Sequence, residues 1–271
     1  MTQTTVAGYA GEIRRQVISM LAEAGSGHPG GSLSVADIMA QLYFDSMNID
    51  PANPTWPERD RLVLCKGHAA PALYAALALR GYFPVAELPN LRKLGSRLQG
   101  HPDMRKLPGV DMSTGSLGQG LSAACGMALA GRLDNRPYYV YAILGDGETQ
   151  EGQVWEAAML AAHYKLDHLI AFLDHNKLQI DGQISEVLSP EPLDEKWRAF
   201  GWRVLTICGH DIAAIAQAIE TAKQSTGQPV MIIAETVKGK GVSYMENQAG
   251  WHGNAPNAEQ TAQALIELEG C

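Results

Sequence analysis

The chain has 271 residues, of which 46% are hydrophobic and 18% charged, and its formal net charge is −8. This length and composition fit one large α/β domain or two small ones, and the acidic balance argues against a general nucleic-acid surface, which would be basic. No apolar run approaches the roughly 20 residues needed to cross a bilayer, and the N-terminus lacks a basic segment followed by an apolar core.

Helices and loops are predicted to dominate the first half of the chain. Apolar residues at helical spacing predict a helix over 6–24 that Gly25-Ser26-Gly27 ends, and Ser34 is predicted to cap a helix over 35–44. A short apolar run over 61–65 predicts a strand. Further helices are expected over 69–79 and 118–132, and loops over 48–58 and 84–114.

Apolar runs of strand length alternate with helical patterns in the second half. The predicted strands are 138–144, 168–174, 202–207 and 229–235. Helices are predicted over 151–163 and 211–224, and a last helix over about 257–269. This alternation is typical of an α/β fold, an open, mostly parallel sheet flanked by helices. We see no repeat or linker, so we expect a single domain over residues 1–271.

Four cysteines occur, and none has a C-x-x-C or metal-ligand spacing. Cys65 and Cys125 lie in apolar surroundings and are expected to be small core residues. We therefore expect a reducing, cytoplasmic location.

Two oxygen-bearing side chains follow two of the predicted strands. Asp146, between Gly145 and Gly147, comes after the strand 138–144, and Asn176 comes thirty residues later, after the strand 168–174. Open α/β sheets bind ligands at the carboxyl ends of strands, and hard oxygens suit Mg²⁺ or Ca²⁺. The alternative is an ordinary turn whose aspartate only caps the next helix.

Four histidines lie beside glycine in turn-like contexts: His28, His68, His101 and His252. Histidine transfers protons near neutral pH and binds phosphate when protonated. Each histidine alone is better explained as a structural residue, but four near a diphosphate-type motif favour a site. His210 is interpreted as an ordinary loop-boundary residue, and strand alternation points the side chain of His175 away from that of Asn176.

The segment 145–182 resembles the thiamin diphosphate motif in its transketolase form, with G-D-G, Glu151 five residues after the aspartate, and N-K-x-x-I-D-G. Transketolases carry further motifs that this chain has in the same order. These are S-G-H-P-G at 26–30, G-H-A at 67–69, G-H-P at 100–102, T-G-x-L-G-Q-G at 114–120, K-G-x-G at 238–241 and H-G at 252–253. The resemblance extends from about residue 10 to residue 256.

The resemblance implies a role for each matching position. Asp146, Asn176 and the carbonyl of Leu178 would hold the divalent ion, Gly115 and Gly147 would approach the diphosphate by backbone, and His68 and His252 would bond it. His28 and His101 would contact sugar hydroxyls, with His28 and His252 as candidates for proton transfer. The remaining expected cofactor neighbours are Ser116, Leu117 at the cofactor ring, Gly145, and Glu151 at the subunit contact. Arg97 matches a family arginine near the channel, or is a solvated loop charge.

The resemblance also implies that a partner is needed, because in transketolases this segment is only the diphosphate-binding domain. A pyrimidine-binding domain supplies a glutamate to the coenzyme and arginines to the substrate phosphate. We expect an α₂β₂ complex with a separate C-terminal subunit, and no activity from this chain alone; a fragment of a longer enzyme is the alternative. The reaction would transfer a two-carbon ketol unit from a ketose phosphate to an aldose.

Xylulose 5-phosphate of the pentose phosphate pathway is the default donor, and other phosphorylated or sulfonated ketoses stay open. Two other readings remain. One is a subunit of another thiamin diphosphate enzyme, similar to 1-deoxyxylulose-5-phosphate synthase or to the α subunit of a 2-oxo acid dehydrogenase. The other is a non-catalytic protein that kept the fold. The pairing of the motifs at 26–30 and 100–102 favours transketolase.

Overall fold

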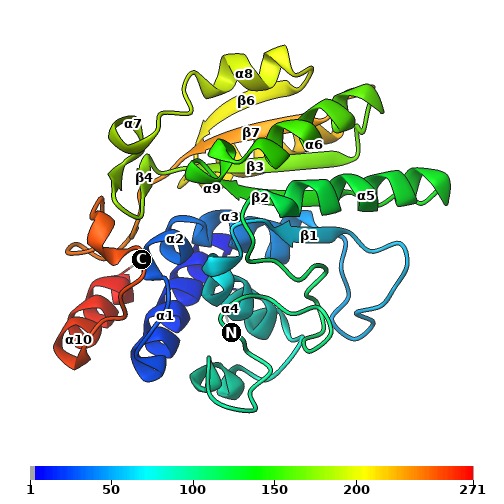
Figure 1. The fold of residues 1–271 in the computed structure, drawn as a ribbon. Helices are drawn as coiled ribbons and strands as arrows, with labels where there is room; N and C mark the ends of the chain where they lie inside the picture. The colour runs from blue at the N-terminus through cyan, green and yellow to red at the C-terminus, as the bar shows by residue number, and fades with distance from the viewer. Residues whose placement is uncertain (1–3, 271) are drawn as a thin grey trace.

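A five-stranded, fully parallel sheet forms the centre of the computed structural model, which describes residues 4–270 (Figure 1). In spatial order its strands are β1 (Arg61–Leu64), β2 (Val140–Gly145), β3 (Leu169–His175), β7 (Val230–Glu235) and β6 (Arg203–Cys208). The predicted strands and their parallel arrangement are confirmed. A two-stranded antiparallel hairpin, β4 (Leu178–Gln179) and β5 (Gly182–Gln183), follows β3.

Helices cover both faces of the sheet (Figure 1). The helices on one face are α1 (Val6–Ala24), α2 (Pro29–Ser34), α3 (Ala36–Gln41), α4 (Ala70–Arg80) and α9 (Ile212–Lys223), with α10 (Ala258–Glu267) packed on α1. The helices on the other face are α5 (Gln119–Leu133), α6 (Gly152–His163) and α8 (Leu193–Ala199). The helix α7 (Ile184–Val187) follows the hairpin. No helix among residues 4–270 combines the length and apolar character required to cross a membrane.

Tighter or wider helical turns complete the chain. They are η1 (Leu42–Ser46, a π-helix) and the 3₁₀ turns η2 (Gly67–Ala69), η3 (Val85–Asn90), η4 (Gly147–Gln150), η5 (Ala249–Trp251) and η6 (Leu268–Gly270).

Strand alternation divides the core into two layers. On β3, Ile170 and Phe172 pack with the α1 side of the sheet, whereas Leu169, Ala171 and Leu173 pack with the α5 side, and all five are fully buried. Because both faces are covered, the strand is apolar at successive positions. Cys65 and Cys125 are buried as predicted, and Cys271 lies outside the described residues.

The predicted helix over 35–44 is wrong in its detail. Val35 separates α2 from α3, and the Ser34 hydroxyl does not cap a helix but donates to Asp174 Oδ2 at 2.7 Å. The short elements over 178–199 were not predicted either, because each is shorter than the span over which apolar periodicity can be read. Of these elements, β4 matters most, because Leu178, Gln179 and the two residues after them line the site described next.

Candidate active site

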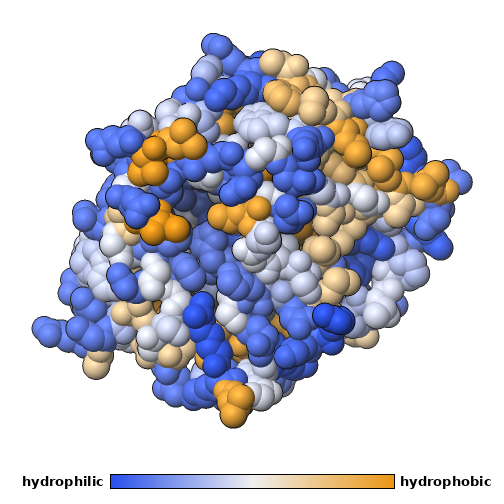
Figure 2. All heavy atoms as spheres, in the orientation of Figure 1, coloured by the Kyte–Doolittle hydropathy of each residue, from blue (hydrophilic) through white to orange (hydrophobic). Residues whose placement is uncertain are grey.

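A cleft of about 320 Å³ opens at the carboxyl ends of β1, β2 and β3. Figure 2 shows a hollow with apolar groups beside it on an otherwise largely hydrophilic surface. Most of the predicted site residues line this cleft: His28, His68, Gly115, Leu117, Gly145, Asp146, Gly147, Glu151, Asn176, Leu178 and His252. His101 and Ser116 do not line it. Residues from distant parts of the chain therefore meet where the sheet topology predicts a ligand site.

Asp146 and Asn176 are delivered by adjacent strands, since Gly145 of β2 pairs with Asp174 of β3. Asp146 accepts hydrogen bonds from the backbone N–H of Gly147 at 2.8 Å and of Lys177 at 2.6 Å. Burial, reinforced by the charge of Asp174, raises the pKa of Asp146 to about 6. A buried carboxylate of this kind is stabilised by a cation.

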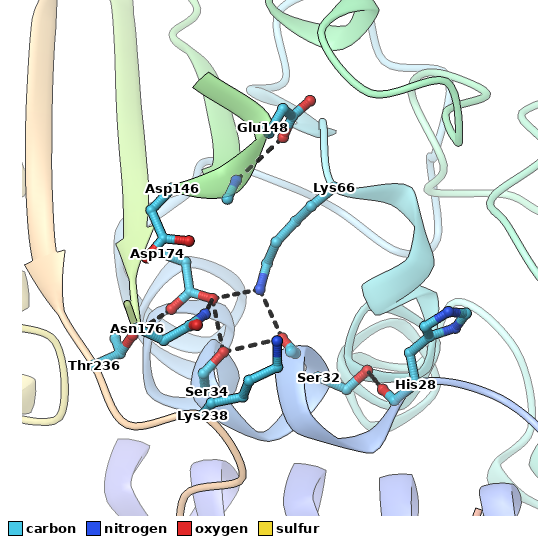
Figure 3. Close-up of polar contacts among 12 residues, drawn as sticks. His28, Ser32, Ser34, Lys66, Asp146, Glu148, Asp174, Asn176, Thr236 and Lys238 are labelled. Atoms are coloured by element: carbon cyan, nitrogen blue, oxygen red, sulfur yellow. Dashed lines mark hydrogen bonds and ion pairs between the residues drawn. The ribbon is translucent and has the colours of Figure 1, made fainter. Parts of the chain in front are cut away.

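The carboxylate of Asp174, fully buried, organises the floor of this site (Figure 3). Its Oδ2 accepts from Lys66 at 2.5 Å, from Ser34 at 2.7 Å and from the side-chain amide of Asn176 at 2.8 Å, and its Oδ1 accepts from Thr236. Burial alone would raise the pKa of Asp174, but the ammonium of Lys66 and these hydrogen bonds hold it below its ordinary value. With the amide nitrogen of Asn176 held this way, its oxygen accepts from the backbone N–H of Leu178 at 3.2 Å and keeps a second lone pair for a ligand.

The sequence analysis did not predict these contacts of Asp174. Lys66 and Ser34 lie 108 and 140 residues from Asp174 along the chain, so no local pattern joins them. The available signal was a pair of ionisable residues at the ends of otherwise apolar strands, which rarely stay buried unless paired.

Three of the four predicted histidines form a triangle. The ring centroids of His28, His68 and His252 are 5.1 to 5.4 Å apart. Burial lowers the pKa of each, to about 4 for His28, 2 for His68 and 3 for His252, with help from neighbouring charges. All three are therefore neutral at pH 7, which leaves each ring with one N–H donor and one acceptor. Nδ1 of His28 is buried and has no hydrogen-bond partner within residues 4–270.

The fourth histidine, His101, stands apart from the triangle and packs on Gly115. A Cβ added at Gly115 would lie 3.0 Å from Cγ of His101. Gly115 has φ of 148°, a conformation that glycine adopts more readily than other residues. His101 thus lies beside the backbone of Gly115, outside the residues that line the cleft.

A second buried ammonium, that of Lys238, faces the cleft. It lies 3.0 Å from the carbonyl oxygen of Leu178 and 2.9 Å from Nδ1 of His252, and it forms no ion pair with a carboxylate among residues 4–270. Burial and the charge of Lys66 lower the pKa of Lys238 to about 8. The site therefore carries positive charge that an anionic ligand would balance. Sequence reasoning quoted Lys238 only as part of a motif.

The donor set suits a hard cation rather than a transition metal. No group of three His, Cys, Asp or Glu side chains able to hold a metal occurs within the described part of the chain. The oxygens of Asp146, Asn176 and Leu178 are of the kind that Mg²⁺ or Ca²⁺ prefers. The Leu178 carbonyl already accepts from a cationic group, the ammonium of Lys238, which fits a position for positive charge.

Arg97, predicted near a channel or in solvent, is engaged elsewhere. Its Nε and Nη2 each donate to the carboxylate of Glu87 at 2.9 Å, and its guanidinium lies over the ring of Phe83. It does not line the cleft.

Known proteins resemble this chain over nearly its whole length. The family model described as "Transketolase, thiamine diphosphate binding domain" matches residues 7–269. The chain is 54% identical to the 6-deoxy-6-sulfo-D-fructose transketolase subunit SqwG of Clostridium sp. (strain MSTE9), over 96% of this chain and 94% of that protein. It is 42% identical to one of the subunits of the apulose-4-phosphate transketolase of Phocaeicola vulgatus, over 94% of this chain and 90% of that protein.

Solved transketolase structures also match this chain over nearly its whole length. A crystal structure of transketolase from Campylobacter jejuni superposes with a TM-score of 0.93 at 36% identity, covering 99% of this chain but 43% of that one. The chain thus spans about two fifths of the length of the solved transketolase and nearly all of the two relatives that are themselves subunits. It belongs to the transketolase family, and it corresponds to the N-terminal, thiamin diphosphate-binding subunit of a transketolase that is divided between two chains.

Proposed function

We propose that this chain holds the diphosphate and metal end of thiamin diphosphate and, with a separate C-terminal subunit, transfers a two-carbon ketol unit from an anionic ketose to an aldose. The observation that carries the proposal is the cleft itself. It combines an oxygen donor set from Asp146, Asn176 and Leu178 with the ammonium of Lys238, which forms no ion pair among residues 4–270. Cation and anion sites side by side are what a metal-bound diphosphate requires.

The chain's own residues would bind and orient that group. The oxygens of Asp146, Asn176 and Leu178 would hold the Mg²⁺ or Ca²⁺ ion, and Lys238 would move from the Leu178 carbonyl to the diphosphate. The backbone of Gly115 and Gly147, which lines the cleft, would approach the phosphate oxygens. The bound coenzyme supplies the nucleophilic carbon of ketol transfer.

The neutral imidazoles determine how protons are handled beside the coenzyme. Lys238 donates to Nδ1 of His252, so the neutral ring carries its proton on Nε2. His68 and His252 are proposed to donate to phosphate oxygens. His28, whose Nδ1 has no partner among the residues that the structure describes, is proposed to exchange a proton with the sugar oxygen. His101, exposed beside Gly115, is proposed to contact sugar hydroxyls farther from the coenzyme.

The partner is proposed to cover the outer face of α5 and α6. Leu133 on α5, and Met159 and Leu160 on α6, are exposed, as is Tyr164 just beyond α6. Figure 2 shows apolar groups on the side of the molecule where α5 and α6 lie. Apolar clusters of this kind typically mark interfaces. An α₂β₂ assembly and a cytoplasmic location stay predictions.

Among donors, 6-deoxy-6-sulfo-D-fructose is favoured, since the relative that is 54% identical is named for it. Xylulose 5-phosphate is the comparison donor. The chain should be co-expressed with a complementary C-terminal subunit, and both donors should be assayed with glyceraldehyde 3-phosphate as acceptor. We expect transfer by the complex and none by this chain alone. Strong ketol transfer by the highly purified single chain would contradict the proposal that both subunits are required.

Calorimetry tests the metal assignment independently of turnover. In the assembled complex, Asp146→Ala should weaken thiamin diphosphate binding in the presence of Mg²⁺ by more than about tenfold, or ~1.4 kcal/mol. Glu259→Ala, which removes an exposed carboxylate in the first turn of α10, away from the proposed partner surface, is the matched control and should leave affinity unchanged. Unchanged affinity of the Asp146→Ala complex would reject the assignment.

A further inference from the structure

An arginine that sequence reasoning passed over lies against the two glycines that precede His28 and His101. A Cβ added at Gly100 would lie 3.2 Å from Cζ and Nη2 of Arg92, and one added at Gly27 would lie 3.8 Å from its Nε. The guanidinium therefore covers Gly100 and borders Gly27. A side chain at Gly100 would crowd the guanidinium, whereas one at Gly27 would clash with the side chain of Leu21.

The backbone holds Arg92 in an unusual conformation. Its φ is 61°, in the left-handed region, and its N–H donates to the carbonyl of Leu98 at 2.9 Å. Left-handed backbone at a non-glycine residue is uncommon and is often associated with function. Here it closes the loop that carries the guanidinium to Gly100.

The charge of Arg92 has no carboxylate partner in the described part of the chain. Its two basic neighbours in the same loop each have a carboxylate: Lys93 lies 2.6 Å from Glu23, and Arg97 lies 2.9 Å from Glu87. The guanidinium of Arg92 forms no ion pair or hydrogen bond with another side chain among residues 4–270, and the residue is exposed. Its field reaches both nearby histidines: after burial, the charge of Arg92 is the next cause that lowers the pKa of His28 and of His101.

Successive contacts lead from the cleft to this guanidinium. Gly115 lines the cleft, the ring of His101 packs on Gly115, and Arg92 covers Gly100, the residue before His101. A ligand whose reacting end lies in the cleft and whose hydroxyls meet His101 would place its far end near Arg92. A sugar has hydroxyls along its length, and the substrates proposed above end in a phosphate or sulfonate.

We propose that Arg92 binds the terminal oxyanion of the sugar substrate and so gives this chain a share in substrate selection. The inference rests on the proposed function and adds to it a specificity residue on the diphosphate-binding subunit. A guanidinium presents paired N–H donors that match two oxygens of a tetrahedral anion, which a lysine ammonium does not. Phosphate and sulfonate share this chemistry, and the experiment below separates them.

Steady-state kinetics of the assembled complex should compare the wild type with Arg92→Ala, Arg92→Lys and Arg97→Ala. The acceptors are glyceraldehyde 3-phosphate and the neutral glyceraldehyde. For Arg92→Ala we expect KM to rise about ten- to hundredfold for the anionic acceptor, as loss of a charged hydrogen bond implies, with kcat nearly unchanged. KM for glyceraldehyde should change less than about twofold. Arg92→Lys should be intermediate, and Arg97→Ala, whose charge is already paired, should behave as wild type.

A second set of assays, with different ketose donors, tests whether Arg92 recognises phosphate, sulfonate or both. KM of Arg92→Ala is compared for xylulose 5-phosphate and 6-deoxy-6-sulfo-D-fructose, with 6-deoxy-D-fructose as the neutral reference. A penalty on both anionic donors supports recognition of a general oxyanion, and a penalty on one alone assigns the site to that anion. An equal rise in KM for anionic and neutral substrates, or the same effect from Arg97→Ala, would overturn the proposal.

A binding measurement on this chain tests anion binding at Arg92 independently of ketol transfer. Histidine-labelled chain is titrated with sulfate at constant ionic strength, and the imidazole resonances of His28 and His101 are followed by NMR. We expect a saturable shift in the wild type that Arg92→Ala loses and Arg97→Ala keeps. An identical shift in the wild type and Arg92→Ala would contradict the site. If the wild-type complex transfers no ketol unit while this sulfate response is present, the proposed function fails and the anion site stands.

Discussion

The ammonium of Lys66 lies 2.5 Å from Oδ2 of Asp174, and both side chains are almost completely closed to solvent. Lys66 follows β1 and Asp174 belongs to β3, so the pair crosses over β2 in the sheet. Because Asp174 also holds the amide of Asn176, this ion pair connects the first strand of the sheet to a proposed metal ligand. The ion pair therefore helps to position Asn176 for the proposed binding of the metal ion and cofactor.

Removing Lys66 should destabilise the fold more than removing both charges. Lys66→Met leaves a buried carboxylate without its cation, and the free energy of unfolding should fall by about 3–5 kcal/mol. Adding Asp174→Asn to Lys66→Met should recover part of that loss. Urea unfolding at pH 7 measures both. A Lys66→Met variant as stable as wild type, or a double variant less stable than Lys66→Met, would contradict this account.

A second buried ion pair predicts a pH dependence of stability. Arg14 and His210 both donate to Asp37. Burial opposes ionisation of Asp37, but the His210 hydrogen bond and the charge of Arg14 prevail and keep its pKa below the ordinary 3.8. A carboxyl with a depressed folded pKa stabilises the fold above its unfolded pKa and loses that contribution as pH falls through the folded value.

Asp37→Asn should therefore cost about 3–5 kcal/mol near neutral pH, and the difference from wild type should shrink below pH 3.8. Urea titrations from pH 7 down to the acid transition measure it. Asp211→Asn, at the exposed start of α9, is the control and changes only a helix cap. A difference that is constant with pH would show that Asp37 is not the titrating group.

His210, interpreted from sequence as an ordinary boundary residue, connects that ion pair to the cleft. Its Nδ1 donates to Asp37 at 2.7 Å, and its Nε2 accepts from the backbone N–H of Val237 at 2.8 Å, next to Lys238. The imidazole therefore holds in place the loop that presents Lys238. This role depends on residues 27 and 173 positions away in sequence.

Substitutions at His210 should separate its two hydrogen bonds. His210→Gln can still offer an oxygen to Val237, whereas the shorter His210→Asn can reach only Asp37. We expect His210→Asn to lose about 1–3 kcal/mol of stability through the unsatisfied Val237 N–H, and to weaken thiamin diphosphate binding more than His210→Gln does. Calorimetry and urea unfolding measure the two effects. Equal cofactor affinity in both variants would leave His210 a purely structural residue.

We predict that a charged substitution on the apolar outer face of α6 blocks association with the C-terminal subunit. Met159 is 55% exposed, so Met159→Glu should leave the chain folded but block binding of the C-terminal subunit. Ile266→Glu on α10, at a position that is 68% exposed, is the matched control and should assemble normally. Sedimentation of the mixed subunits decides between them. Normal assembly of Met159→Glu would place the partner elsewhere.

The sequence by itself determined the layered α/β architecture and the chemistry of the ligands. Apolar runs such as 168–174 can be read locally, because a strand covered on both faces needs apolar residues at successive positions. Asp146, Asn176 and the glycine-flanked histidines could be identified because their residue types limit what they can bind. The hydroxyl of Ser34 was misread because the same residue type serves a helix cap and a buried donor equally well.

Only the tertiary structure decided which distant groups meet. The strand order β1-β2-β3-β7-β6 brings Lys66 to Asp174, and loop closure sets Arg92, rather than Arg97, against the histidine loops. Local sequence determines backbone preference and burial pattern, since both depend on neighbours within a few residues. Whether the charge of Asp174 is paired depends on Lys66, 108 residues away, and only the folded chain places the two within hydrogen-bonding distance.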